Sequence, residues 1–305
     1  MATQREMEFA YSLTDRMVRV SLGENADFSG AKYDGDFSLP LEQAQRRKHE
    51  FVAQQLGIRR GSRVLDLGCG WGPMLKYLQD IGADGIGVTL STAQAEACRR
   101  NGLVVHLMDA RAVTPETFGR FDAVVSLGAW EHFCSPAEFR AGRQEEIYRD
   151  VFRRVADLLP PGGRFYLQTM VFGRNMVPPE QIDLASPASN GYYVALMMKQ
   201  FPGSWLPFGR DQLVRTAAPS FRPVMMSSGR LDYIETIRQW RLRFAAPSVR
   251  KMLLKLWLLP RYLVSADFRL AFASGVSANT VCFERELLDH FRMVFEKAGP
   301  TAATP

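Results

Sequence analysis

The sequence predicts an α/β fold in which helices cover both faces of a seven-stranded, mostly parallel β-sheet. Short apolar segments alternate with longer segments of helical periodicity, the pattern of strands joined by helices. The apolar segments are continuous rather than alternating in polarity, as expected for strands buried on both faces. With 305 residues, 47 % of them hydrophobic and 23 % charged, the chain is long enough for a large core and too apolar for wholesale disorder.

The first 171 residues contain the most regular part of this pattern. A helical segment is predicted at 41–56, followed by strands at 63–67, 85–89, 104–108, 121–127 and 164–170, with helices at 73–80, 92–101 and 144–159 between them. Two prolines and two glycines at 160–163 end the last helix and turn the chain. We therefore expect an N-terminal helical lid at 1–57 and a ligand-binding core at 58–171.

The remaining residues are less regular and are predicted to cover the core. Segment 172–205 is rich in Pro, Met, Asn and Gly, as in an insertion. Further strands are predicted at 222–227 and 279–285, and the helical segment between them, 233–272, is too long for a simple crossover. The expected divisions are a cap with the sixth strand at 172–278, the last strand and a C-terminal helix at 279–297, and a disordered tail at 298–305.

The net charge of +6 is concentrated in the cap. Residues 201–262 contain eleven Lys and Arg against three Asp and Glu, so this segment carries +8. A solvated helix face, an anionic substrate group and an anionic membrane surface would each explain the excess. Nucleic acid is disfavoured, because no nucleic-acid-binding motif accompanies the charge.

Cysteine spacing and hydropathy indicate a cytoplasmic protein. The four cysteines form no Cys-x-x-Cys pair, so neither a disulfide framework nor a metal site is predicted. The charged N-terminus lacks the apolar segment of a signal peptide, and no stretch approaches the ~20 apolar residues of a membrane span. We expect a protein that touches a membrane only at its periphery. The sequence leaves its oligomeric state open.

A glycine-rich loop after the first strand is the strongest candidate site. The sequence Leu-Asp-Leu-Gly-Cys-Gly-Trp-Gly at 65–72 places Gly68, Gly70 and Gly72 between a strand and a helix, where backbone can approach a ligand closely. A dinucleotide loop needs Gly-x-Gly-x-x-Gly, and here the third glycine comes one residue early. A carboxylate at Asp66 would repel a pyrophosphate but suits the amino group or sulfonium of S-adenosylmethionine, which is the predicted cofactor.

This loop resembles motif I of class I methyltransferases, and its Gly-Trp-Gly form is similar to that of the cyclopropane-fatty-acyl-phospholipid synthase and mycolic acid methyltransferase family. Segments 28–33, 87–91, 126–133, 201–207 and 233–240 resemble further motifs of this family in the same order. The resemblance implies a Rossmann-like class I methyltransferase fold with a helical cap. It also implies cofactor contacts at Ser29, Asp66, Gly68, Gly70, Gly72, Thr89, Leu90, Gln94, Asp109, Ala110 and Trp130.

Methyl transfer to an alkene carbon sets the demands on the reacting site. The π bond is the nucleophile and a carbocation results, so the site must be dry, tolerant of positive charge and equipped with a base. Glu131 is the candidate acidic residue, and His132 beside it is either a second base or a residue that holds the loop. Candidate walls of an apolar substrate tunnel, each of which also fits a core position, are Tyr193, Trp205, Phe208 and Trp240.

The resemblance also implies a bicarbonate base, but only in part. In that family the matching Glu belongs to a bicarbonate pocket together with a Cys, a His and a Tyr. Glu131 and Tyr233 match, whereas Gly30 stands at the Cys position and Gln168 at the His position. The sequence leaves open whether bicarbonate takes the proton or Glu131 takes it, directly or through a water held by Gln168 and Tyr233.

The expected function is S-adenosylmethionine-dependent C-methylation of an alkene carbon in an unsaturated lipid or lipid-like substrate, including one with an anionic group. Proton loss from the new methyl gives a cyclopropane, and loss from a neighbouring carbon gives a methyl-branched or methylene product. Two alternatives remain: a methyltransferase of a prenyl chain or an amine nitrogen, and a catalytically silent cofactor-binding protein.

Overall fold

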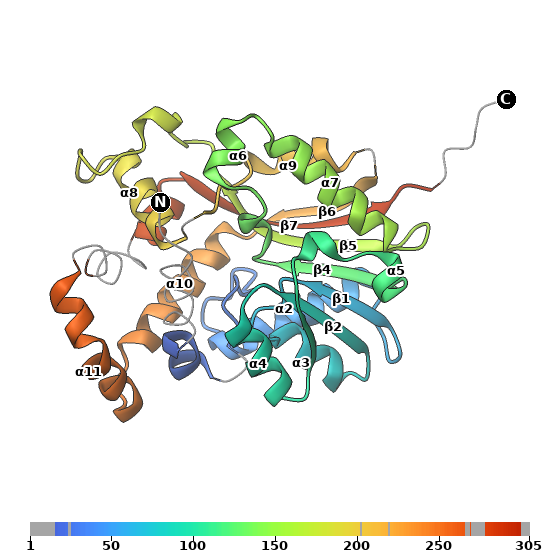
Figure 1. Cartoon of the computed structure of the whole chain (residues 1–305), viewed down its shortest axis with the longest axis horizontal. Coiled ribbons are helices and arrows are strands. Elements are labelled where there is room, and N and C mark those ends of the chain that lie inside the picture. Colours follow the sequence, from blue (N-terminus) through green and yellow to red (C-terminus); the bar gives the residue numbers. More distant parts are fainter. Residues whose placement is uncertain are drawn as a thin grey trace.

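A seven-stranded β-sheet in the order β3-β2-β1-β4-β5-β7-β6 forms the centre of the computed structural model (Figure 1). The strands are β1 Arg63–Leu67, β2 Asp84–Thr89, β3 Val104–Leu107, β4 Ala123–Leu127, β5 Arg164–Phe172, β6 Phe221–Ser228 and β7 Leu288–Lys297. Strands β1 to β5 pair in parallel, whereas β7 is antiparallel to both β5 and β6. The predicted seven-stranded, mostly parallel sheet is confirmed. The structure describes residues 16–23, 26–201, 203–218, 220–265, 269 and 278–299.

Helices cover both faces of this sheet, as predicted. One face packs against α2 (Leu41–Leu56), α3 (Pro73–Asp80) and α4 (Thr92–Arg100), and the other against α7 (Gln144–Asp157) and α9 (Gly209–Ala217). Figure 1 shows α7 and α9 above the sheet and α3 and α4 below it. The short helices between strands are α5 Pro115–Phe118, α6 Pro136–Arg140, η1 Ala110–Ala112, η2 Trp130–His132 and η3 Pro179–Gln181.

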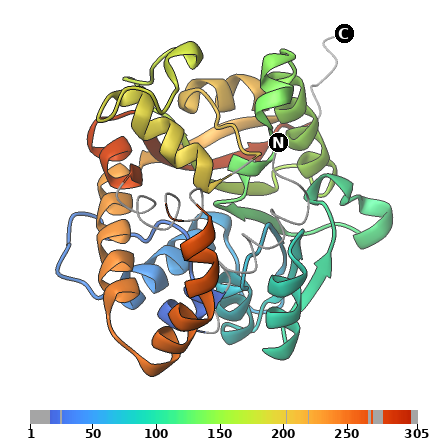
Figure 2. The same ribbon diagram turned by 60° about the vertical axis from the view of Figure 1, so that its left-hand side comes forward.

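The cap contains α8 (Asn190–Gln200), α10 (Arg230–Ala245) and α11 (Val249–Val264). The predicted strand at 222–227 is β6. A single helical segment is expected at 233–272. Its part up to residue 264 is two helices, because Pro247 disfavours helical backbone in the residue before it and Ala246 has ψ 126°. Residues 266–268 and 270–272 lie outside the described residues. Figures 1 and 2 both place α8 and α11 on the same side of the molecule. Within the described residues, no helix is long and apolar enough to cross a membrane.

The prediction for residues 279–297 is wrong in its order. The predicted strand at 279–285 lies in a helix at 278–284, and the predicted C-terminal helix is strand β7. Ala278 and Cys282 are buried one helical turn apart, a spacing that a short apolar segment does not reveal. In β7, buried His290 and Arg292 hide the apolar character of the strand. The predicted domain boundaries stay a prediction, and residues 300–305 of the predicted tail lie outside the described residues.

Candidate active site

The glycine loop between β1 and α3 leaves open space above its middle glycine. Gly68, Gly70 and Gly72 have φ values of +86°, +55° and +77°. A Cβ at Gly68 would lie 2.2 Å from the Cβ of Ala129, and one at Gly72 would lie 2.5 Å from Leu103. A Cβ at Gly70 would have no described atom within 4 Å. Packing therefore requires glycine at the outer two positions, whereas the space at Gly70 is available to a ligand.

Asp66 lies at the end of β1 as a buried carboxylate, to which no described residue donates a hydrogen bond. Burial raises its pKa to about 7, the charge of Asp27 adds to the rise, and Lys48 opposes it. A buried carboxylate without a partner is unfavourable by itself and gains by binding a cation. This environment fits the ammonium or sulfonium group of S-adenosylmethionine.

A buried polar network holds the N-terminal segment next to this carboxylate. The Lys48 ammonium donates to both Asp27 oxygens at 2.7 and 2.8 Å, to Ser29 Oγ at 2.6 Å and to Gln45 Oε1 at 2.7 Å. Burial opposes ionisation of Asp27, but Lys48 and His49 together hold its pKa below the usual range. Ser29, a predicted cofactor residue, is thus fixed by this network. Asp27 and Lys48 escape sequence analysis, because a lysine on an amphipathic helix is normally solvated.

The second predicted loop presents an exposed apolar side chain beside a charged pair. Thr89 Oγ1 donates to Gln94 Oε1 at 2.7 Å, and Leu90 is 72 % exposed. The amide of Met108 donates to the Thr89 carbonyl, which brings Asp109 and Ala110 next to this loop. Both oxygens of Asp109 bind Arg111, so the predicted adenine acceptor already has a cationic partner. An exposed leucine at this position suits an aromatic ring.

The side chain of Trp130, a predicted cofactor contact, lies in an aromatic cluster of the core. The indole is fully buried and packs against Phe133, Tyr148, Phe152 and Phe165. Two of these rings, those of Tyr148 and Phe152, belong to α7.

Glu131 is one of the residues that line a small apolar cavity. Its Oε1 accepts from the Met170 amide at 2.7 Å, and no described residue donates to its Oε2. Burial raises the pKa of Glu131 to about 7, although the Met170 amide lowers it. The described residues that line the cavity are Glu131, His132, Met170, Phe172, Met197, Met198, Phe201, Ser204 and Leu206.

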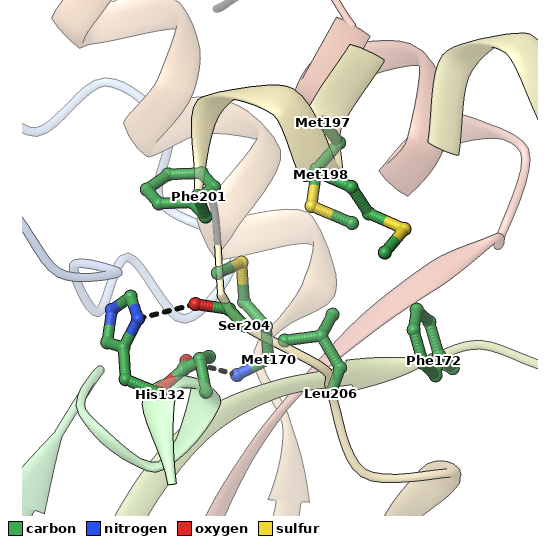
Figure 3. A pocket seen from close by; sticks show the side chains of 9 residues that line it. His132, Met170, Phe172, Met197, Met198, Phe201, Ser204 and Leu206 are labelled. Carbon is green, nitrogen blue, oxygen red and sulfur yellow. Dashed lines mark hydrogen bonds between the residues drawn. The ribbon is translucent and has the colours of Figure 1, made fainter. Parts of the chain in front are cut away.

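His132 lies in the same cavity wall and is held by a cap residue. Its Nδ1 is 2.7 Å from Ser204 Oγ, and burial lowers its pKa below the ordinary value. The ring is therefore neutral near pH 7. Figure 3 shows His132 and Ser204 on one side of the cavity, with the two methionines of α8 across from them.

The four predicted substrate residues are not among the described residues that line this cavity. Trp205 stacks on Phe139 and Trp240 stacks on Phe28, with ring centroids 4.3 Å apart in each pair. Phe208 packs against Phe139 and Phe172, and Arg285 lies over the ring of Tyr193. The lining instead includes Met197 and Met198, which are consecutive residues near the end of α8, and Phe201, which directly follows this helix.

Tyr233, Gln168 and Gly30 meet around a histidine that sequence analysis missed. Gln168 Nε2 donates to the Gly30 carbonyl at 2.9 Å. The ring of Tyr233 lies 4.7 Å from that of His290, and burial and then the charge of Glu131 raise its pKa above the usual range. His290 is buried on β7 opposite Met170 of β5, and no described residue bonds to its Nδ1. Burial, Arg292 and Lys48 lower its pKa well below the ordinary value, so the ring is neutral.

Two features of these residues oppose a bicarbonate site. A Cβ at Gly30 would lie 2.5 Å from Tyr233 and 2.9 Å from His290, so the two rings occupy the space that a cysteine would need. The Gly30 carbonyl requires a donor, which fixes the orientation of the Gln168 amide and leaves its Oε1 without a donor from any described residue. The unsatisfied oxygens of Gln168 and Glu131 are acceptors, so an anion here would depend on the Tyr233 hydroxyl and the His290 ring as donors.

The sequence and the fold are similar to those of characterised enzymes. Residues 1–254 match the mycolic acid cyclopropane synthetase family. The chain is 30 % identical over 206 residues to cyclopropane mycolic acid synthase 2 of Mycobacterium leprae, an alignment that spans 65 % of each protein. It is also 30 % identical over 213 residues to cyclopropane-fatty-acyl-phospholipid synthase of Escherichia coli K12, covering 68 % of this chain and 48 % of that enzyme.

Solved structures show the same fold. The cyclopropane synthase MmaA2 from Mycobacterium tuberculosis superposes with a TM-score of 0.73 at 21 % identity, covering 97 % of this chain and 99 % of that chain. Mycolic acid cyclopropane synthase CmaA1 complexed with SAH and CTAB gives a TM-score of 0.73 at 22 % identity, with 94 % and 95 % covered. The fold is thus that of the class I methyltransferases. The chain belongs to the mycolic acid cyclopropane synthetase family of S-adenosylmethionine-dependent methyltransferases.

Proposed function

We propose that this protein methylates an alkene carbon in the unsaturated chain of a lipid or lipid-like molecule. One observation carries the proposal: a small apolar cavity, lined largely by Met and Phe side chains, contains the buried carboxylate of Glu131, one oxygen of which has no donor among the described residues. An apolar cavity selects a hydrocarbon chain, and a single buried base suits removal of one proton.

The residues proposed to hold S-adenosylmethionine are Asp66, the backbone around Gly70, Ser29, Thr89 and Leu90. Asp66 would neutralise the positive end, and exposed Leu90 would contact the adenine ring. When bound, the cofactor supplies an electrophilic methyl group.

The protein side chains have to manage the positive charge that develops on the substrate. The alkene π electrons would form the new carbon–carbon bond to the methyl while the carbon–sulfur bond breaks and its electron pair goes to sulfur. This leaves a carbocation at the neighbouring substrate carbon. Methionine sulfur and phenylalanine faces around the cavity stabilise this charge, and their packing excludes the water that would trap it. Glu131 Oε2 then takes a proton, and the electrons of the broken C–H bond close a three-membered ring or form a new double bond.

Tyr233 and His132 have supporting roles in this proposal. The raised pKa of Tyr233 keeps its hydroxyl protonated and able to donate toward the Glu131 carboxylate. Neutral His132, bound to Ser204, forms part of the cavity wall beside Glu131. Which carbon loses the proton depends on how the chain is seated against Oε2, so the product is a cyclopropane, a methyl-branched or a methylene compound.

The lipid substrate places the enzyme at a membrane periphery. The charge of +8 on residues 201–262 suits an anionic substrate group or membrane surface.

Incubation of the purified protein with S-adenosylmethionine and fractionated lipids tests the proposal. We expect S-adenosylhomocysteine to form together with a lipid product that has gained one CH₂ by mass spectrometry, and NMR then separates a cyclopropane from a methyl-branched or methylene alkene. Methylation of amines or prenyl diphosphates in place of lipids would support the alternative substrates. Absence of turnover with every class, despite cofactor binding, would indicate a silent cofactor-binding protein.

A further inference from the structure

Helix α11 carries an unusual share of the exposed apolar surface. Within the described part of the chain, half of the exposed large apolar side chains lie on this one helix. They are 38–83 % exposed and are Val249, Met252, Leu253, Leu256, Trp257, Leu259, Tyr262, Leu263 and Val264. The sixteen residues of the helix include four Lys and Arg and no Asp or Glu. A helix of this composition needs an apolar and anionic neighbour.

The side chains of α11 are sorted into three sectors around the helix axis. At about 100° per residue, buried Lys251, Leu254 and Leu258 form one stripe that faces the protein. The Lys251 ammonium donates there to the carbonyls of Arg243 and Ala246. The opposite sector of the helix is apolar and exposed. It contains Met252, Leu256 and Leu263 toward one border and Leu253 toward the other.

The exposed cations lie at the two borders of the apolar sector. Arg250 follows one border and Lys255 precedes the other, and both side chains are exposed. An apolar face flanked by cations on both sides is the arrangement of a helix that lies in the plane of a membrane interface. Figure 2 shows α11 at the front of the molecule, below α8, whose methionines line the substrate cavity.

We propose that α11 docks the enzyme on an anionic lipid bilayer, with the sector containing Met252, Leu253, Leu256 and Leu263 inserted at the interface. A second copy of this chain is a poor occupant, because two helices without acidic residues would bring like charges together. A bilayer satisfies the apolar sector and both cationic borders at once. The inference rests on the proposed function, since a lipid substrate has to be reached at such a surface.

Trp257 offers an internal probe of this contact. All five tryptophans lie in the described residues, and Trp71, Trp130, Trp205 and Trp240 are at most 6 % exposed. Trp257 is 55 % exposed on the apolar side of α11, with the Arg16 guanidinium over its ring. Quenching by acrylamide in water and by brominated acyl chains in a bilayer therefore reports mainly on Trp257, and a Trp257→Phe variant assigns the signal.

The test measures sedimentation of the full chain with vesicles of equimolar phosphatidylcholine and phosphatidylglycerol, and with phosphatidylcholine alone. We expect at least ~10-fold stronger partitioning to the anionic vesicles, weakened by salt, with Trp257 protected from acrylamide and quenched by brominated lipid. Leu253→Glu with Leu256→Glu should lower partitioning at least ~10-fold, and Arg250→Ser with Lys255→Ser should remove most of the anionic preference. Val104→Glu, at an exposed apolar position on edge strand β3, is the matched control and should bind as the parent does.

Equal partitioning of the parent and the Leu253→Glu, Leu256→Glu variant would overturn the proposal, as would protection of Trp257 by an acidic carrier protein but not by vesicles. Circular dichroism of each variant excludes loss of folding as the cause. Turnover of detergent-dispersed lipid separates this inference from the proposed function. A variant that keeps that turnover but no longer binds vesicles supports the docking role, whereas vesicle binding without any lipid turnover contradicts only the proposed function.

Discussion

Replacing Glu131 with glutamine should abolish most of the turnover while making the protein more stable. The amide oxygen of glutamine can still accept from the Met170 amide at 2.7 Å, but the group that replaces Oε2 no longer takes a proton. Loss of a general base lowers turnover by at least ~10²-fold. Affinity for S-adenosylmethionine should stay within a few-fold, since Asp66 and the glycine loop are unchanged.

The stability change follows from the sign of the pKa shift. Burial raises the pKa of Glu131 from 4.5 to about 7, so the folded protein binds more protons than the unfolded chain between these values. The stability that the protonated form contributes is fully present below about pH 4.5 and is lost as the pH rises through 7. At pH 8 the folded protein therefore holds an unfavourable buried charge, and the Gln variant should gain about 3 kcal/mol in free energy of unfolding.

Three measurements check this reasoning. Initial rates of S-adenosylhomocysteine formation with an unsaturated lipid give turnover, calorimetric titration gives cofactor affinity, and urea unfolding at pH 5 and pH 8 gives stability. The parent rate should rise with pH and level off above about 7, an inflection absent from the variant. Glu96→Gln, at an exposed carboxylate on α4, is the isosteric control and should change none of these. Turnover of Glu131→Gln within threefold of the parent would refute the assigned role.

Three further perturbations follow from the geometry. Gly68→Ala should prevent cofactor binding, because the new methyl displaces Ala129 and strains a backbone with φ +86°. Gly70→Ala should keep the fold and lower cofactor affinity, measured by calorimetry, by ~10-fold or more. Equal cofactor affinity of the parent and Gly70→Ala would contradict the open space at Gly70. Gly30→Cys should lower the free energy of unfolding in urea by about 1–3 kcal/mol, because the new side chain pushes against Tyr233. Turnover of the parent in carbonate-free buffer should equal its turnover with added bicarbonate. A clear rise in turnover with bicarbonate would restore bicarbonate as the base. Lys48→Met leaves the Asp27 carboxylate buried without its main partner, so it should lower the free energy of unfolding in urea by about 3–5 kcal/mol. An unchanged free energy of unfolding would show that the network is not coupled to folding.

The sequence predicts the parallel half of the sheet well, because each buried strand is a continuous apolar segment between turn residues. The starts and ends of α2 and α3 also follow from local signals, such as the proline that begins α3 and the glycine that follows α2. The motifs at 65–72 and 126–133 place the glycine loop and Glu131, since the chemistry there depends on neighbouring residues of one segment.

The parts that escape prediction depend on contacts between distant segments. His290 enters the site only because β7 pairs with β5, and nothing near it in sequence marks it as buried. Lys48 is an ordinary helical lysine until Asp27 and Ser29 fold against it. Aromatic composition alone did not separate Trp205, which packs in the core, from Phe201, which lines the cavity. Local patterns identify surfaces that are apolar, but the packing partner decides which of them faces a ligand.

The position of β7 also bears on how the enzyme is made. This strand lies between β5 and β6, and Arg292 on it binds both Asp232 of the cap and the carbonyl of Ala31 near the start of the described chain. While the polypeptide is being synthesised, the glycine loop and its four neighbouring strands can assemble first. Strands β5 and β6 pair only through β7, so they cannot join one sheet until residues 288–297 have left the ribosome. A nascent chain would therefore form the cofactor site before it forms the substrate cavity that excludes water from a carbocation. Methyl transfer would then begin only after β7 has been added to the sheet.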